Sequence, residues 1–397
     1  MVTSSYPRFP GDGIGSFVEP IAKSVAARGH DVHLVAPWHP AIRRPDQEAG
    51  VQFHFYKYAP VPALNVFGYS GGLRADTTLR GAAWMAAPFA MAAGWWAARR
   101  VAAKYRATVM HGHWVIPSGV MAALAKPSLP LVVSLHGSDV FVAERNFMAR
   151  QAARAAFRRA GWVTACSDDL RTRAVAIGAR ADRIETVPYG VDAGRFHPDA
   201  AVRAAVRQEL GIGDGPLVFT AGRLVRKKGF EYLIDAAGAL TDIPGLTVVI
   251  AGDGDLRDEL SARVASARSA VRLIGNRSQD EIARLCAAAD VIAVPSIRDD
   301  AGNVDGLPNF AMEALASATP VVASRAGGLP QVIADGRTGR LVAERDPTGL
   351  ASAVRWLLEH PSEARHIGAA ARADIVARFG WADAAARFEA AYARAHR

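Results

Sequence analysis

Cysteine is scarce in this chain of 397 residues: only Cys166 and Cys286 occur, and they lie far apart without a Cys-x-x-Cys pair. Two isolated cysteines supply neither a disulfide framework nor a cysteine-rich zinc site. The sequence therefore excludes the small disulfide-stabilised class and indicates a reducing compartment. We expect a cytoplasmic protein. The alternative is a peripheral protein on the inner face of the membrane.

Clear targeting and membrane-spanning segments are also lacking. The first residues, MVTSSYPRFPGDG, have neither the basic start nor the apolar core of a secretion signal, so export is not expected. Residues 81–98, GAAWMAAPFAMAAGWWAA, are uncharged, but Ala and Gly dominate them and Pro88 interrupts them. This segment is at the lower length limit of a membrane span, and we interpret it as a buried or interfacial helix.

The composition is that of a folded protein with an excess of positive charge. Half of the residues are apolar and 21% are charged, which excludes a disordered chain, and the length favours two domains over one core. The net charge of +9 and the pI near 9.9 fit three kinds of partner. These are nucleic acid, an anionic membrane surface, and anionic small molecules such as sugar nucleotides.

Short β-branched runs that end in Gly, Pro or Ser alternate with longer stretches of helical spacing. This alternation predicts repeated βαβ units around parallel sheets, so the expected fold class is α/β with two doubly wound domains. The expected strands are residues 33–37, 51–56, 107–112, 130–137, 162–167 and 183–190, followed by 217–223, 246–252, 271–275, 290–296 and 319–324.

A segment rich in Pro and Gly, residues 188–201, separates the two series of strands and is interpreted as a hinge. We therefore predict a domain at 1–190, a second at 191–378, and a final helix at 379–397. Doubly wound sheets bind ligands beyond the carboxyl ends of their strands. The residues that follow the strands are thus the candidates for function.

The stretch DGLPNFAMEALASATPVVAS, residues 305–324, combines a turn, a helix start and a strand. The first amide groups of that helix, including those of Asn309 and Phe310, favour a negative ligand group such as phosphate. Asp305 and Glu313 are then placed to bind hydroxyl groups on either side of it. The alternative interpretation makes Glu313 a surface residue and Asp305 a helix cap.

Two cations follow the strand at 217–223. Arg223 offers a planar fork of donors and Lys228 a point charge, and together they can neutralise a diphosphate. The alternative is a solvated basic loop, which is common for an Arg-Lys-Lys run.

Histidine and glycine motifs appear in the first half. His136, in SLHGSDV, closes a strand, as does the motif HGHW at 111–114. Such a histidine is more often a structural hydrogen-bonding residue than a catalytic one. GDGIGSF, at 11–17, contains Gly13 and Gly15 before a helix, although a Gly-rich turn alone is weak evidence of nucleotide binding.

Taken in order, these motifs resemble the retaining glycosyltransferases of family 4, which have the GT-B fold of two Rossmann-like domains facing each other across a cleft. The segments that carry the resemblance are GDGIGSF, ARGHDVHLVAP, VSLHGSDV, the hinge YGVDAGRFHP, the loop GRLVRKKG, and the acid pair of 305–313 followed by PVVAS. The resemblance implies that the first domain binds the acceptor and the second the nucleotide sugar, with the final helix crossing back to the first.

The resemblance also implies roles at matching positions. Arg223 and Lys228 would hold the diphosphate, Glu313 the ribose, Asp305 the donor sugar, and His136 a sugar hydroxyl near the reacting carbon. Backbone groups from Gly275 to Arg277 would meet the base, the amides of Asn309 and Phe310 the phosphates, and Gly13 or Gly15 would let the first loop approach them.

Three features depart from the family pattern. Asp305 stands where Glu is usual, which shortens the reach of this acid, and Tyr189 stands where the hinge usually has Asn. The chain also begins so close to its first strand that we expect the strand to be clipped.

The implied activity is transfer of a sugar from a UDP or GDP sugar to a hydroxyl acceptor, with retention of anomeric configuration, in cell-surface polysaccharide or glycolipid synthesis. Neither a metal nor a cofactor is required, because fixed positive groups stabilise the departing diphosphate. The acceptor is either free or lipid-linked, and no nucleic-acid partner is expected.

Other activities stay open. A sugar phosphorylase or an epimerase would use the same fold. A basic protein that binds membrane surfaces or nucleic acid would explain Arg99, Arg100, Lys104 and Arg106 beside two tryptophans.

Overall fold

The computed structural model describes residues 1–61, 64–65, 67–69, 73–74, 78–79, 81–267 and 270–397. The chain forms two compact units. The N-terminal unit consists of Met1–Tyr189 together with Trp381–Arg397, and the C-terminal unit consists of Gly190–Gly380. Each unit has its own parallel sheet and its own helices, so each is described by itself.

The sheet of the N-terminal unit is parallel except for one short strand. In one group, β6, β7, β8 and β9 pair in this order. In the other group, β3 pairs with β1 in parallel and with β2 antiparallel. Val2 joins the two groups, since it bridges to Val35 of β1 and Gly112 of β6. The strands are β1 (Val32–Pro37), β2 (Gln47–Glu48), β3 (Val51–Tyr56), β6 (Met110–His113), β7 (Leu131–Leu135), β8 (Trp162–Ala165) and β9 (Ile184–Thr186).

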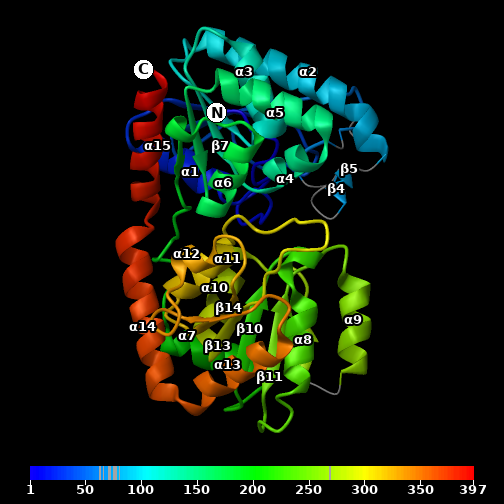
Figure 1. Cartoon of the computed structure of the whole chain (residues 1–397), viewed down its shortest axis with the longest axis vertical. Helices are drawn as coiled ribbons and strands as arrows, with labels where there is room; N and C mark the ends of the chain where they lie inside the picture. Colours follow the sequence, from blue (N-terminus) through cyan, green and yellow to red (C-terminus); the bar gives the residue numbers. More distant parts are fainter. Residues whose placement is uncertain (62–63, 66, 70–72, 75–77, 80, 268–269) are drawn as a thin grey trace. The chain divides into compact units, whose positions relative to one another are not determined.

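Helices pack on this sheet, and the last helix of the chain is one of them. α15 (Trp381–Ala395) lies against α1, β7 and β8 (Figure 1). Two short strands, β4 (Leu73–Arg74) and β5 (Thr78–Leu79), pair antiparallel before α2. The other helices are α1 (Val18–Ala27), α2 (Gly81–Lys104), α3 (Val120–Ala125), α4 (Ser138–Arg145), α5 (Phe147–Arg159) and α6 (Asp168–Ile177).

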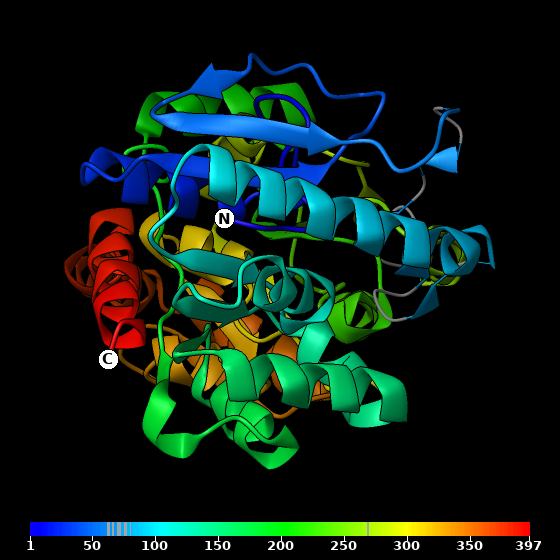
Figure 2. The ribbon, with the colours of Figure 1, turned by 90° about the horizontal axis from the view of Figure 1, so that it is seen from above.

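α2 contains the uncharged segment 81–98 and runs beside β1 and β3 (Figure 2). Its buried side is a stripe of small residues at four-residue spacing, Ala90, Gly94, Ala98 and Ala102. Large apolar residues of the same helix point to solvent, so only one side of the helix is buried, and the interfacial alternative stays a prediction. None of the helices in the described parts of the chain has the length and hydropathy needed to cross a membrane.

The sheet of the C-terminal unit has six parallel strands in the order β12-β11-β10-β13-β14-β15. The chain winds outward from β10 to β12 on one side and from β13 to β15 on the other. The order therefore reverses between β10 and β13, the place where doubly wound sheets bind ligands. The strands are β10 (Leu217–Ala221), β11 (Thr247–Ala251), β12 (Val271–Leu273), β13 (Val291–Val294), β14 (Val321–Ser324) and β15 (Arg340–Val342).

The core of this unit is apolar and continuous. α8 and α13 bury Phe230, Leu233 and Val354 against β10, β11 and β13. The helices are α7 (Ala200–Leu210), α8 (Phe230–Gly238), α9 (Arg257–Ser266), α10 (Gln279–Ala288), α11 (Asn309–Ala316), α12 (Leu329–Val332), α13 (Pro347–Glu359) and α14 (Pro361–Arg378). The expected class, parallel α/β units wound around two sheets, is confirmed.

Candidate functional site

The candidate site of the C-terminal unit lies at the carboxyl ends of β10 and β13. Arg223 and Lys228 come from the loop after β10, and Asp305 from the loop after β13. Because these two strands are neighbours in the sheet, their loops meet at one edge although about eighty residues separate them in sequence.

A glycine makes the close approach of the two loops possible. Gly229 ends the 3-10 turn Arg226–Lys228 with a φ of 64°, in the left-handed region. A Cβ atom here would lie 2.0 Å from the carbonyl oxygen of Pro295, which follows β13. The amide of Ile297 also donates to the carbonyl of Lys227 at 2.9 Å, so the turn is fixed against the β13 loop.

This contact brings two lysines to one carboxylate. The Lys228 Nζ lies 2.6 Å from Asp305 Oδ2, and the Lys227 Nζ lies 3.0 Å from Asp305 Oδ1. Burial alone would raise the pKa of Asp305, but the two ammonium groups hold this pKa well below its usual value. The sequence prediction missed Lys227, for which the Arg-Lys-Lys run is the only signal.

Arg223 adds a third cation near Asp305, and we call Arg223, Lys227, Lys228 and Asp305 the charged cluster. Burial lowers the pKa of Arg223 below its ordinary value, while Asp255 and Asp305 act in the opposite direction. A guanidinium remains protonated at any pH of interest, so Arg223 supplies permanent positive charge beside Asp305.

The start of α11 adds backbone donors to this edge. Pro308 precedes the helix, and the first amides, those of Asn309 and Phe310, have no partner within it. The Phe310 ring is buried and meets Phe219 of β10 edge-on, with ring centroids 5.7 Å apart. Only the amide of Phe310 can therefore serve a ligand, whereas Asn309 also presents a buried Oδ1 without a hydrogen-bond partner among the described residues.

Glu313 follows one turn later in α11. Burial raises the pKa of Glu313 to about 7, while Arg195 and Lys228 oppose this rise. Arg195 itself forms an ion pair with Asp280 at 3.1 Å. Arg195 was not among the predicted site residues, although it lies in the hinge motif YGVDAGRFHP.

The predicted base-binding segment lies further along the sheet. Gly275 follows β12, and its carbonyl accepts from the amide of Gly252 at 2.8 Å. The Arg277 side chain approaches Glu281 in the first turn of α10 at 3.6 Å. β11 separates this segment from β10, so it lies at the same sheet edge as Arg223 but two strands away.

In the N-terminal unit, His136 takes part in a chain of hydrogen bonds. Its Nδ1 lies 2.7 Å from the Tyr189 hydroxyl, and its Nε2 lies 3.2 Å from His113 Nδ1. Burial and then His113 keep the pKa of His136 well below its usual value, so the ring is neutral at pH 7. Both ring nitrogens are engaged, and a sugar hydroxyl would have to displace or join one of these partners.

Other residues fix the His136 loop. Asp139, which is buried, accepts from the amides of His136, Gly137 and Val115 at 3.3, 3.0 and 2.7 Å. The Phe17 ring lies 4.6 Å from His136, and Tyr189, the residue that departs from the family pattern, stacks on Phe17 at 4.9 Å. Asp139 lies in the motif SLHGSDV and holds the backbone of this loop, a role that was not predicted from the sequence.

The glycine loop also belongs to the N-terminal unit. Gly15 has a φ of 66°, and a Cβ there would lie 2.6 Å from Ser5 Oγ, whereas a Cβ on Gly13 would meet nothing within 4 Å. The predicted residues therefore fall into two groups. Gly13, Gly15 and His136 lie in the N-terminal unit, and the remaining site residues lie in the C-terminal unit.

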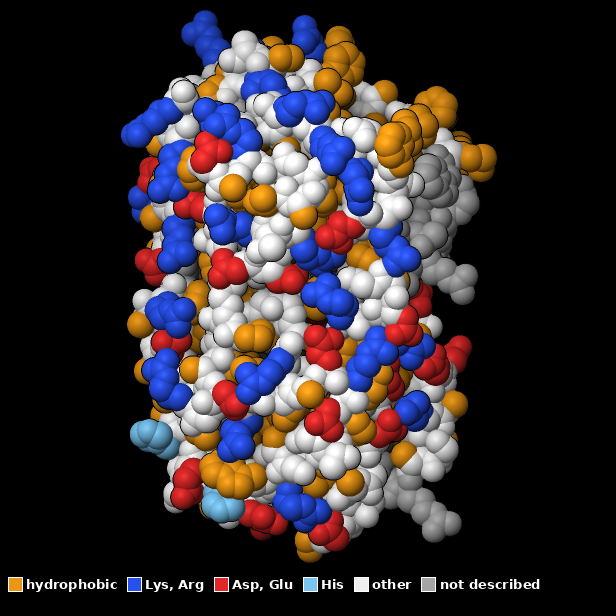
Figure 3. All heavy atoms as spheres, in the orientation of Figure 1, with side chains coloured by type: hydrophobic (Ala, Val, Ile, Leu, Met, Phe, Trp, Pro, Cys, Tyr) orange, Lys and Arg blue, Asp and Glu red, His pale blue; other side chains and the backbone are white. Residues whose placement is uncertain are grey.

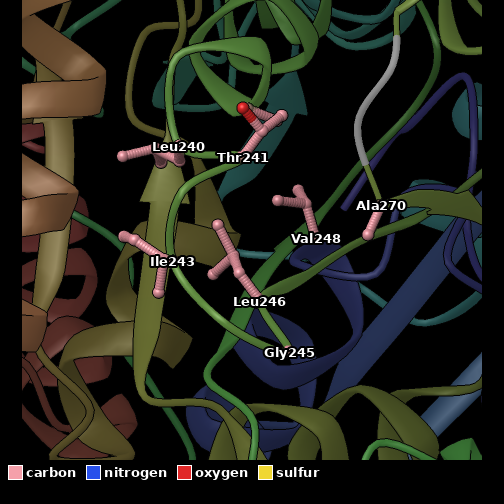
Figure 4. Close-up of a pocket in the computed structure, with 8 residues that line it drawn as sticks. Leu240, Thr241, Ile243, Gly245, Leu246, Val248 and Ala270 are labelled. Carbon is pink, nitrogen blue, oxygen red and sulfur yellow. The ribbon is translucent and has the colours of Figure 1, made fainter.

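A pocket of about 300 Å³ in the C-terminal unit is separate from the charged cluster (Figure 4). It lies at the amino end of β11, opposite the edge that carries Arg223. Its lining is almost wholly apolar and consists of Ala237, Leu240, Thr241, Ile243, Gly245, Leu246, Val248 and Ala270. Across the described residues, no group of three or more His, Cys, Asp or Glu side chains is arranged to hold a metal ion.

Two protein families match the chain. Residues 12–190 match the glycosyl transferase 4-like domain, and residues 202–374 match the glycosyl transferases group 1. A GDP-mannose-dependent alpha-(1-6)-phosphatidylinositol monomannoside mannosyltransferase from Mycolicibacterium smegmatis is 34% identical over 265 residues, covering 65% of this chain and 68% of the relative. A glycogen synthase from Mycobacterium tuberculosis is 28% identical over 415 residues, covering 100% and 94%.

A solved structure has the same fold. The structure of Anabaena Alr3699/HepE in complex with UDP superposes with a TM-score of 0.77 at 21% identity, and 98% of each chain is covered. The fold, the two family matches and the mannosyltransferase relative lead to one conclusion: the chain belongs to the group 1 glycosyltransferases of family 4, which have the GT-B fold.

Proposed function

We propose that this glycosyltransferase moves a sugar from a UDP or GDP sugar to a hydroxyl acceptor and retains the anomeric configuration. The observation that carries the proposal is the convergence of Arg223, Lys227 and Lys228 near the start of α11, where the strand order reverses. Fixed cations and helix amides at such an edge are suited to a diphosphate.

In the proposed reaction, the bond between the anomeric carbon and the diphosphate oxygen breaks while the acceptor oxygen bonds to the same carbon. The acceptor proton passes to the departing diphosphate. Negative charge grows on that diphosphate, so Arg223, Lys228 and the amides of Asn309 and Phe310 lower the barrier from fixed positions. The reaction requires neither a metal ion nor a cofactor.

The remaining groups bind the two sugars and the base. Glu313 accepts hydrogen bonds from the ribose, Asp305 from the donor sugar, and Gly275 to Arg277 present backbone groups to the base. His136 binds a sugar hydroxyl, and Gly13 or Gly15 lets the loop at residues 11–17 approach the phosphates closely.

The names of relatives support this choice of donors and setting. GDP-mannose is the donor named for the M. smegmatis relative, whose named acceptor is a phosphatidylinositol mannoside, and UDP is bound in the Anabaena structure. The first of these names supports our proposal of a role in cell-surface polysaccharide or glycolipid synthesis.

The test is a transfer assay with UDP, GDP and ADP sugars, in which the product anomer is identified by NMR. Arg223→Ala and Lys228→Ala are expected to lower turnover by about a hundredfold or more, with an unchanged circular dichroism spectrum. Full activity in either variant would overturn the proposed site. An inverted product would overturn retention, and dependence on free phosphate would favour a phosphorylase.

A second proposal concerns the surface that the enzyme contacts. We propose a peripheral position on an anionic membrane, supported by the solvent-facing side of α2, where Met85, Phe89 and Trp96 are 74%, 67% and 53% exposed. Arg99, Arg100 and Lys104 continue the same helix. Hydrophobic side chains gather at the upper right of Figure 3, where α2 begins, and blue Lys and Arg side chains line the upper edge.

Apolar rings and neighbouring cations on one helix are typical of binding to the interface of anionic lipids. Trp95, in contrast, donates through Nε1 to the carbonyl of Leu124 at 3.1 Å. It is therefore Trp96, and not both tryptophans, that is available to a bilayer.

A further inference from the structure

Lys227 and Lys228 are consecutive residues whose ammonium groups share one carboxylate. Each pairs with a different oxygen of Asp305, at 3.0 Å for Lys227 and 2.6 Å for Lys228. The side chains of Lys227, Lys228 and Asp305 are only 11%, 18% and 12% exposed. The three charges are thus shielded from solvent, and the Coulomb attraction within each pair is less screened than in an ion pair on the surface.

This arrangement raises a difficulty for diphosphate binding. Lys228 lies closest to Asp305, so it must leave or share this carboxylate when it turns to a phosphate group. Removing the partner of a shielded carboxylate costs free energy, because the remaining charge is then neither hydrated nor paired. With Lys228 as the only cation on Asp305, donor binding would have to overcome that cost.

Lys227 removes the difficulty. Its backbone carbonyl is bonded to the amide of Ile297, so the residue is anchored to the same β13 loop that carries Asp305. Its ammonium group already contacts Asp305 Oδ1 and can continue to neutralise the carboxylate when Lys228 moves away.

We propose that Lys227 is a positioning residue of the donor site, which keeps Asp305 neutralised and in place while Lys228 is transferred to the diphosphate. This inference rests on the proposed function, since it takes the diphosphate of the donor as the ligand of Lys228. It also explains how an acid one methylene shorter than Glu is held near the cluster: two cations draw it toward the β10 loop.

The test is titration calorimetry with UDP and GDP, which carry the diphosphate but no donor sugar and so leave out the proposed sugar contact of Asp305. Lys227→Met is expected to weaken binding by about tenfold or more. Lys227→Arg keeps the charge and is expected to restore most of the affinity, which a loss of packing alone would not predict.

The decisive measurement is the same substitution in an Asp305→Asn background. Without the carboxylate, Lys228 has no charge to leave behind, so Lys227→Met should change affinity by less than about threefold. Arg226→Gln is the matched control, because Arg226 lies on the same turn but pairs with Glu231 and Glu259 at 3.2 and 2.8 Å. This control is expected to bind as the wild type does.

The outcomes separate the two proposals. Wild-type affinity in Lys227→Met, or an equal loss in both backgrounds, would overturn the role of Lys227 while the donor site stands. A wild-type protein that binds neither UDP nor GDP would overturn the proposed function and this role with it. If Lys227→Met does not fold, Lys227→Gln in both backgrounds decides by the same comparison.

Discussion

Glu313 is a partly buried acid whose pKa is moved into the neutral range. Burial raises this pKa to about 7 from an ordinary value of 4.5, against the opposing effects of Arg195 and Lys228. The folded protein therefore binds the proton more tightly than the unfolded chain does. The resulting stabilisation is complete below pH 4.5 and is lost as the pH rises through 7, which amounts to a change on the order of 3 kcal/mol.

We predict that Glu313→Gln removes this pH dependence. The free energy of unfolding of the variant should exceed that of the wild type at pH 8, and the difference should shrink toward pH 5, because Gln imitates the protonated acid. Urea unfolding at pH 5, 6.5 and 8 measures both proteins. Parallel pH curves for the two would show that Glu313 is not the responsible group.

At the scale of residues, the sequence shows which residues lie at the ends of the strands, but it does not show which side chains contact one another there. Arg223, Lys228, Asp305 and Asn309 lie at one sheet edge because each follows a strand or starts a helix, and both features are visible in the sequence. The contact between Lys227 and Asp305 is not visible, since it depends on the left-handed turn at Gly229 and on the pairing of β10 with β13.

The expected strands were recognisable from their apolar runs, which in parallel sheets are buried on both faces. β10 and β11 are buried at every position. β15 was missed because it is three residues long and begins with Arg340. A short edge strand with a charged residue has no apolar run to mark it.

At the scale of an element, the apolar periodicity of α2 does not decide which side of the helix is buried. Apolar residues occur on both sides of this helix, and the small ones at Ala90, Gly94 and Ala98 are buried because they let the helix approach its neighbours closely. The large residues are left outside. Composition predicted the helix correctly, but only the packing shows which side faces solvent.

We predict that this exposed side binds anionic vesicles. The protein should float with vesicles that contain phosphatidylglycerol and should be released from them by high salt, because the cations of α2 act only near the surface. Phe89→Ser with Trp96→Ser should lower the recovered fraction by more than about half.

Val376→Ser is the matched control for this experiment. Val376 is exposed and apolar but lies on α14 of the C-terminal unit, so its substitution should leave flotation unchanged. Equal losses in both variants would indicate a general effect of reduced hydrophobicity. No flotation of the wild type would end the membrane proposal.

At the scale of the whole molecule, the sequence predicts two series of βαβ units but not the order of their strands. The spacing of apolar runs is the same for any doubly wound sheet, so it does not reveal that β10 lies beside β13. This neighbour relation, which joins loops far apart in sequence, creates the charged cluster. Motif spacing supplied the candidates, and only the topology brings them together.

The division of the chain gives a prediction for ligand binding. Every residue of the charged cluster lies within Gly190–Gly380, so UDP or GDP should stabilise that unit directly. At a ligand concentration one hundred times the Kd, the expected gain is about 2.7 kcal/mol, or a rise in Tm of roughly 5–10 °C for a unit of this size. Calorimetry with increasing UDP and GDP measures this shift.

Hydrogen exchange on the same preparation shows which segments UDP or GDP stabilises. Hydrogen exchange should slow most in peptides from the β10 and β13 loops and from α11, because the ligand opposes their local opening. Peptides of α15 should change least, although this helix follows the C-terminal unit in sequence, because Trp381–Arg397 packs with the N-terminal unit. Protection confined to the N-terminal unit would place the nucleotide there and contradict the assignment of Arg223 and Lys228 to the diphosphate.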